Sequence, residues 1–307
     1  MDNKMIKAMA RQRVMDTKYP AKKLALIYIG VTVISGLLLS LLGAFLEGQM
    51  DAHGGLGGME FRTALSMLQT ALMVAVTLAT PFWNLGYTSA ALKTARNESP
   101  EPKSLLAGFR VILPGLRLYL LQIAVVMAVS ILAMQVGTIL YVMSPASDGA
   151  LIFLEQMLKD VSVIDEAMAL DILKLMWPMY LMIGIVLLAL LIPVAYRLRL
   201  TDFQLLEGHE GALRNMALSR RKMRGNCFRF FRLDLGFWWY YLLQLAAVAL
   251  SYGDALVGDS QLAYWGFYIA SCVGQVVVAY CFLPRVATTY AVAYDEITKE
   301  KEQEQQQ

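Results

Sequence analysis

The residues best suited to binding chemistry lie in one stretch, Ala217 to Leu235, which reads ALSRRKMRGNCFRFFRLDL. Six basic side chains and three phenylalanines lie within it. Basic residues neutralise phosphates and aromatic rings stack on bases, so this composition would suit a nucleic acid. It would equally suit a membrane surface, where cations contact anionic headgroups and apolar side chains enter the interface. The segments on either side of the stretch must decide between these two interpretations.

Other residue types that support catalysis or metal binding are scattered. The three cysteines include no CxxC pair, and His53 and His209 lie far apart, so we expect no metal site and no cofactor. The glycine-rich run DAHGGLGGM lacks the Lys-Ser/Thr pair of a phosphate-binding loop and is interpreted as a tether. An intramembrane lipid enzyme would need clustered His, Asp, Glu or Cys at one depth. The sequence has no such cluster, which predicts a protein that is not an enzyme.

Long apolar runs dominate the chain, which is 58% hydrophobic and 17% charged, with a mean hydropathy of +0.52. A bilayer core of roughly 30 Å requires about 20 helical residues. The sequence predicts six spans, at residues 24–46, 63–87, 118–143, 175–196, 235–252 and 262–283. Inside lipid, helices satisfy every backbone polar group. We therefore expect an all-α, polytopic membrane bundle of six transmembrane helices, with amphipathic helices on both sides. The first run is too long for a cleavable signal peptide.

The charges alternate from loop to loop. Of 27 lysines and arginines, 24 lie in the N-terminal segment, the loops after spans two and four, and the C-terminal tail, while the other three loops are acidic. The positive-inside rule then places both termini in the cytoplasm. The predicted location is the bacterial cytoplasmic (inner) membrane.

Three segments outside the spans also carry patterns. Residues 1–23 predict a basic amphipathic helix on the inner leaflet, or alternatively only orientation charges before span one. In the outer loop after span three, apolar residues recur every three or four positions from Leu154 to Ile172, which predicts amphipathic helices. Residues 295–307 are polar without an apolar stripe and are expected to be a disordered cytoplasmic tail, leaving 24–294 as the membrane domain.

The basic and aromatic stretch Ala217 to Leu235 adjoins span five. A helix is predicted from Gly211 to Met223, with Gly225 as its stop and with Leu213, Met216 and Met223 on one face. The aromatic residues that follow run directly into a membrane span, so they suit the lipid interface and not a nucleic acid. We therefore expect anionic-lipid contact and no nucleic-acid partner. The expected contact residues are Arg220, Arg221, Lys222 and Arg224. Asp234, at the inner end of span five, is expected to form a structural ion pair with an arginine, with a proton site as the alternative.

Eight residues of this region follow the pattern S-x3-M-x-G-x5-F-x-L-D-L-x-F, namely Ser219, Met223, Gly225, Phe231, Leu233, Asp234, Leu235 and Phe237. This pattern resembles the signature of a bacterial family of integral membrane proteins, found mainly in Gram-positive species and known as domain of unknown function 975. The resemblance implies a multi-span helical bundle in the cytoplasmic membrane. It implies no reaction and no ligand.

Other segments extend the resemblance from Gly86 to Tyr294. They are the run GYTSAALKTARNESPEPKSLLAGF, Pro193 with its following aromatic-Arg pair, and Pro284 with an Ala-x-x-Tyr ending. Two residues depart from the family pattern: Gly236 stands where Ser is usual, and Arg285 where Tyr is usual. A fainter resemblance links the chain to membrane domains of some glycerophosphodiester phosphodiesterases, whose catalytic domain is missing here.

The expected function is a non-enzymatic membrane accessory that binds lipid or a partner protein. A small-molecule transporter or exporter is the alternative, since six spans, two prolines in span four and amide-bearing helices would allow it. The lack of charged residues in the central turns of the spans argues against transport.

Overall fold

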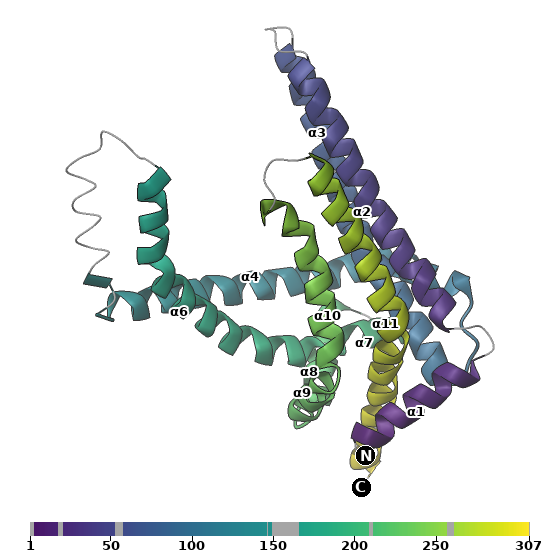
Figure 1. Ribbon diagram of the computed structural model, residues 1–307. Helices are drawn as coiled ribbons and strands as arrows, with labels where there is room; N and C mark the ends of the chain where they lie inside the picture. Colours follow the sequence, from purple (N-terminus) through teal and green to yellow (C-terminus); the bar gives the residue numbers. More distant parts are fainter. Residues whose placement is uncertain are drawn as a thin grey trace. The chain divides into compact units, whose positions relative to one another are not determined.

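The computed structural model describes residues 3–17, 21–52, 58–145, 147–148, 166–208, 211–256 and 261–306. All regular secondary structure within these residues is helical (Figure 1). The chain divides into two compact units. The first contains residues 1–116 and 200–307, and the second contains residues 117–199. Each unit is described by itself.

Long helices form the body of the first unit. Helices α2, α3 and α11 pack on one another, and α10 packs on α11 (Figure 1). Helix α1 crosses the C-terminal part of α11, so the N-terminus and the C-terminus lie at the same end of this unit. The bounds are α1 Asn3–Asp16, α2 Ala21–Ala52, α3 Gly58–Ala95, α10 Trp238–Ala249 and α11 Gln261–Gln306.

Short helices gather at the end of the first unit where the chain termini lie. They are η1 Pro102–Val111, α7 Thr201–Leu206, α8 Ala212–Met223 and α9 Cys227–Leu235, while η2 Leu250–Leu256 follows α10. We call this end the basic end, because it carries α1, α8 and α9 with their lysines and arginines. A bend of 63° separates α9 from α10. A short helix that turns sharply into an apolar one is typical of a chain that passes from an interface into a bilayer.

The second unit contains α4 from Arg117 onward, within Ile112–Val142, and α6, Glu166–Leu198. Gly137 lets these two helices approach closely, since a Cβ there would lie 2.7 Å from the Ile183 Cα. Pro178 and Pro193 both lie inside α6, where each removes a backbone N–H donor.

Among the described residues, five helices are long and apolar enough to cross a bilayer, and six if the bent pair α9–α10 forms one span. This confirms the predicted all-helical, multi-span fold. The 18-residue apolar windows of the five helices are at most 17% buried. Side chains this apolar and this exposed require lipid around them, because water would not solvate them favourably.

The predictions for the C-terminal tail and for the outer loops have different outcomes. The expected disordered tail is wrong for residues up to Gln306, because α11 continues to that residue. In this last part of α11, Ile297 is fully buried and Glu300 forms an ion pair with Arg229. These contacts hold the helix, and they cannot be predicted from the polar composition of the tail. Most of the predicted outer-loop amphipathic helices and the centre of the glycine-rich run lie outside the described residues.

Candidate functional site at the basic end

Helix α8 is set between two glycines with left-handed backbone. Gly211 precedes it with φ of 86°, and Gly225 follows it with φ of 88°. Residues with a Cβ adopt this conformation at a cost, so both positions favour glycine. The predicted helix and its stop at Gly225 are therefore confirmed. Gly225 lies in the short turn that connects α8 to α9.

The buried face of α8 differs from the predicted one. Asn215, Met216, Ser219 and Met223 are buried, whereas Leu213 is 73% exposed. At about 100° per residue, Leu213 lies roughly a quarter-turn from the centre of the face that Ser219 and Met223 define. The Ser219 Oγ accepts a hydrogen bond from the Leu200 backbone N at 3.2 Å. This contact joins α8 to the start of α7 and gives the signature serine a structural role.

Lys222 does not lie with the other three basic residues expected to contact lipid. Its Nζ donates hydrogen bonds to Thr298 Oγ1 at 2.9 Å and to the Tyr294 hydroxyl at 3.4 Å, and lies 4.7 Å from the Tyr294 ring centroid. Partial burial lowers the pKa of Lys222, because desolvation disfavours its charged form. Lys222 therefore belongs to an internal polar network and not to the exposed basic surface.

That network centres on Tyr294 and Glu207. The Tyr294 hydroxyl donates to Glu207 Oε2 and accepts from Gln204 Nε2 at 2.8 Å, while the Tyr294 and Phe203 rings stack at 4.9 Å. Arg96 completes it, with Nη2 at 2.6 Å from Glu207 Oε1 and 2.8 Å from Asp295 Oδ1. The network links the C-terminal ends of α3, α7 and α8 to the part of α11 around Tyr294 and Asp295.

Charge and burial act in opposite directions on Glu207. Desolvation raises the pKa of its carboxyl, but hydrogen bonds from Tyr294 and Arg96 outweigh it and leave the pKa below the ordinary 4.5. No local sequence pattern marks this network, since its members are spread over about 200 positions. The Ala-x-x-Tyr ending, which includes Tyr294, was the one signal that pointed to it.

The exposed surface of α8 and α9 combines cations with aromatic rings. Arg220, Arg221 and Arg224 are all exposed. Phe228 and Phe231 are 66% and 40% exposed, and their rings stack at 6.2 Å. The Arg232 guanidinium carbon lies 5.4 Å from the Phe228 ring centroid. We call these six residues the α8–α9 surface.

The opposite side of α9 packs against α11. Phe230 and Leu233 are buried, and the Phe230 ring stacks on Tyr290 at 6.3 Å. Asp234 accepts hydrogen bonds from Tyr290 and from Tyr241, the latter at 3.3 Å. The prediction for Asp234 emphasised an arginine partner and did not identify these two tyrosines.

The remaining signature residues fall in different places. The Lys7 Nζ lies 4.7 Å from the ring centroid of Phe237, which links α1 to the bend before α10. Pro193 lies in α6 of the second unit, and Pro284 lies within α11 of the first. The spacing pattern thus combines residues that hold α8 and α9 with residues of the exposed surface, such as Phe231.

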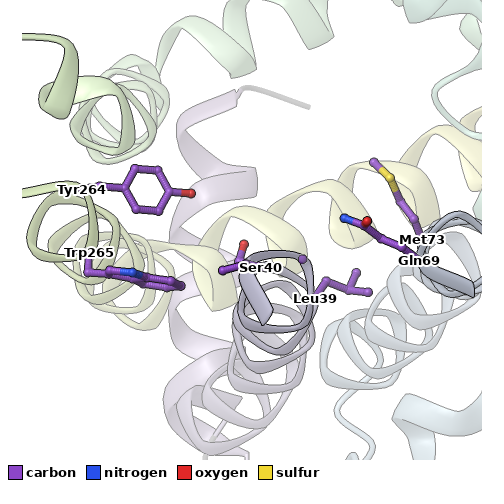
Figure 2. A pocket seen from close by; sticks show the side chains of 8 residues that line it. Leu39, Ser40, Gln69, Met73, Tyr264 and Trp265 are labelled. Carbon is purple, nitrogen blue, oxygen red and sulfur yellow. The ribbon is translucent and has the colours of Figure 1, made fainter. Parts of the chain in front are cut away.

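A pocket of about 470 Å³ lies among α2, α3 and α11, away from the basic end (Figure 2). We call it the uncharged pocket, because the described residues that line it carry no charge. Figure 2 shows Gln69 and Met73 on one side and Tyr264 and Trp265 on the other. Ser40 also lines it and donates a hydrogen bond to the Tyr268 hydroxyl at 2.9 Å. Ser40 lies five residues before the end of the apolar part of α2 at Phe45, or about 8 Å along the axis.

Within the described residues, no group of three or more His, Cys, Asp or Glu side chains could hold a metal ion. The basic end can therefore offer hydrogen-bond donors and cations to a ligand. Its exposed cations suit an anionic ligand, and three nearby carboxylates, those of Glu207, Asp234 and Asp295, are engaged by Arg96, Tyr290 and Tyr294.

Comparison with known proteins supports the resemblance that the signature carries. Neither curated proteins nor solved structures gave a match. A family model described as "Protein of unknown function (DUF975)" matches residues 1–301, almost the whole chain. The chain therefore belongs to the DUF975 family of multi-span membrane proteins.

Proposed function

We propose that this protein is a non-enzymatic accessory of the bacterial cytoplasmic membrane, whose α8–α9 surface binds anionic phospholipid headgroups. The observation that carries the proposal is the shared exposure of Arg220, Arg221 and Arg224 with Phe228 and Phe231. The guanidinium groups can form paired hydrogen bonds to phosphate oxygens, and the two rings can enter the acyl boundary.

The charge asymmetry of the chain supports the orientation in this proposal. With the basic end at the anionic inner leaflet, each exposed cation near the surface contributes about 1 kcal/mol to membrane attraction. Both termini are then cytoplasmic, in agreement with the positive-inside rule. Phe230 and Leu233, on the side of α9 that faces α11, are buried and hold α9 in place. The α8–α9 surface therefore lies on a well-packed helix.

The proposal predicts a change in lipid retention. The protein is purified from nanodiscs that contain equal amounts of phosphatidylglycerol and phosphatidylcholine, and the lipids that remain bound are counted by native mass spectrometry. Wild type should retain phosphatidylglycerol preferentially. The variant Arg220→Gln/Arg221→Gln/Arg224→Gln should lose most of this preference, because each lost phosphate contact weakens headgroup binding.

A matched control removes three exposed cations from other elements, as Lys103→Gln/Arg110→Gln/Lys299→Gln. This control changes the net charge by the same amount and should keep the preference. Equal lipid retention by wild type and the α8 variant would contradict the proposal. Lys222 stays unchanged in both variants, since it serves the internal network.

Transport of a small molecule is the second candidate, and the uncharged pocket that holds Ser40 and Gln69 favours it. A transport site should be reachable from both sides of the membrane in turn. Gln69→Cys, in a background where Cys227, Cys272 and Cys281 are replaced by Ser, can be labelled with an impermeant maleimide in oriented vesicles. Labelling from both sides would support transport, and labelling from one side would favour the accessory role.

The last proposal concerns the structure of similar membrane domains. We infer that the membrane domains attached to glycerophosphodiester phosphodiesterases share the arrangement of α8, α9 and α10. A solved structure of such a domain without a short bent helix before the corresponding span would contradict this inference.

A further inference from the structure

A second pocket at the basic end lies where three helices meet. It has a volume of about 270 Å³ and is formed by the end of α1, the start of α2 and the part of α11 around Pro284. None of its lining residues belongs to the α8–α9 surface. Its volume lies slightly below the roughly 300–1,000 Å³ of pockets that hold drug-sized ligands, so it suits a small group.

Three basic side chains line this pocket, Arg11 from α1, Lys22 from α2 and Arg285 from α11. All three are exposed, and no carboxylate is among the described residues that line the pocket. Three cations that line one pocket from separate helices repel one another unless an anion lies between them. The Lys22 Nζ also lies 5.4 Å from the Tyr280 ring centroid, which keeps its stem beside α11.

The rest of the lining combines a hydroxyl with apolar atoms. Thr17 adds a polar group, while Val14, Met15, Ala21 and Pro284 supply apolar walls. The apolar part of α2 begins at Ala21, so the pocket lies at the boundary between a candidate membrane span and its polar flank. Phospholipid phosphates lie at this depth in a bilayer.

We infer that this pocket binds a single phosphate group, with Arg11, Lys22 and Arg285 as its ligands. Two guanidinium groups can each form paired hydrogen bonds to phosphate oxygens, and the ammonium of Lys22 adds a third positive charge. The phosphate can belong to one phospholipid headgroup or to a soluble phosphate compound, and both sources present the same chemistry. The inference does not rest on the α8–α9 surface, since the two share no residue.

Cys281 provides a reporter, because it lines the pocket and its side chain is exposed. Cys227 and Cys272 are replaced by Ser, and modification of Cys281 by N-ethylmaleimide is timed in neutral detergent. Three probes are added separately: inorganic phosphate, dihexanoyl phosphatidylglycerol and dihexanoylglycerol, which has no phosphate. A bound probe should slow modification about tenfold at roughly ten times its Kd, because modification then requires the empty pocket.

The three probes distinguish the sources of phosphate. Slowing by dihexanoyl phosphatidylglycerol alone would support a lipid headgroup site, and slowing by inorganic phosphate as well would support a site for soluble phosphates. Slowing by dihexanoylglycerol to the same extent as by the phosphatidylglycerol probe would overturn the inference, and so would unchanged modification with every probe.

Variants then assign the ligands. In the variant Arg11→Gln/Lys22→Gln/Arg285→Gln, the probes should no longer slow the modification of Cys281. Each rate is compared with that of the same variant without probe. The control Lys103→Gln/Arg110→Gln/Lys299→Gln should slow as wild type does. Full protection in the pocket variant would overturn the assignment. If the triple variant does not fold, the single change Arg285→Gln should weaken protection, and unchanged protection there would count against the site.

Discussion

Gly86 and Gly30 lie on neighbouring helices of the first unit, but only Gly86 is closely packed against another element. A Cβ at Gly86 would lie 1.8 Å from the Leu105 backbone oxygen, and one at Gly108 would lie 1.9 Å from the Phe82 oxygen. A Cβ at Gly30 would meet nothing within 4 Å. The basic end is thus held by backbone packing between α3 and η1, while the apolar part of α2 leaves its surface to lipid.

Polar groups show the same contrast. At the basic end, buried side chains form links between elements, such as the hydrogen bond from Leu200 N to Ser219 Oγ. Along the apolar helices, hydroxyls mostly bond within their own helix, as Ser35 Oγ does with Val31 O at 2.7 Å. The part of the unit around η1 and α7 is thus specified by protein contacts, whereas the outward faces of its apolar helices are specified by their fit to a bilayer.

The largest effect is expected for Gly86→Ala. The new Cβ must displace the Leu105 carbonyl, and such overpacking costs about 3 kcal/mol or more. Gly30→Ala is the matched control, which should be neutral or stabilising by up to about 1 kcal/mol because Ala favours helix. Thermal unfolding in neutral detergent measures both. Equal melting temperatures for the two variants would remove the distinction between the two regions.

A smaller effect is expected for Arg96→Gln. The change leaves Glu207 and Asp295, which are mostly buried, without their shared cation, at a cost of about 2 kcal/mol. Arg110→Gln removes an exposed cation of η1 and should change the free energy of unfolding by less than about 0.5 kcal/mol. The same unfolding assay applies, and an Arg96 variant as stable as the Arg110 variant would show that the network adds nothing.

Ser219→Ala should have a moderate effect. It leaves the buried Leu200 N–H without its Oγ acceptor, which costs about 1–2 kcal/mol. Ser35→Ala removes a hydroxyl that bonds only to its own helix in an exposed position, and should stay within about 0.5 kcal/mol of wild type. Melting temperatures of the pair, measured side by side, test the comparison at single hydrogen bonds.

The smallest effect is the pH dependence from Glu207. Its pKa in the folded protein lies below the ordinary 4.5, so the unfolded chain takes up the proton first as pH falls. The stabilisation is complete above about 4.5 and is lost as pH drops through the folded pKa. Melting temperatures from about pH 7 to about pH 3.5 should fall less for Glu207→Gln than for wild type. If the melting temperatures of the two proteins fell equally with pH, the lowered pKa of Glu207 would be contradicted.

The fold was largely predictable because its signal is local. Twenty apolar residues in a row predict a helix in lipid wherever they occur, and Gly225 marks the end of α8 through its own backbone. The tail beyond Asp295 was not predictable in this way. In this helix Ile297 is buried, and Glu300 pairs with Arg229, which lies 71 positions earlier in the sequence.

The candidate site was predictable only in part, for the same reason. Arg220, Arg221 and Arg224 are exposed as their charge suggests, but Lys222, between them in sequence, turns towards Thr298. Helical spacing gives the direction of each side chain within about 100° and does not say which element covers it. That information comes from α11, more than 70 residues away.

The central claim is that the α8–α9 surface binds anionic lipid, and photocrosslinking tests it most directly. Wild-type protein in mixed nanodiscs receives a trace of phosphatidylglycerol or phosphatidylcholine that bears a diazirine near the headgroup, and crosslinked peptides are mapped by mass spectrometry. The account predicts that phosphatidylglycerol crosslinks concentrate on residues 220–232 and fall sharply in Arg220→Gln/Arg221→Gln/Arg224→Gln. Equal crosslinking of this segment by both lipids, unchanged in the variant, would contradict it.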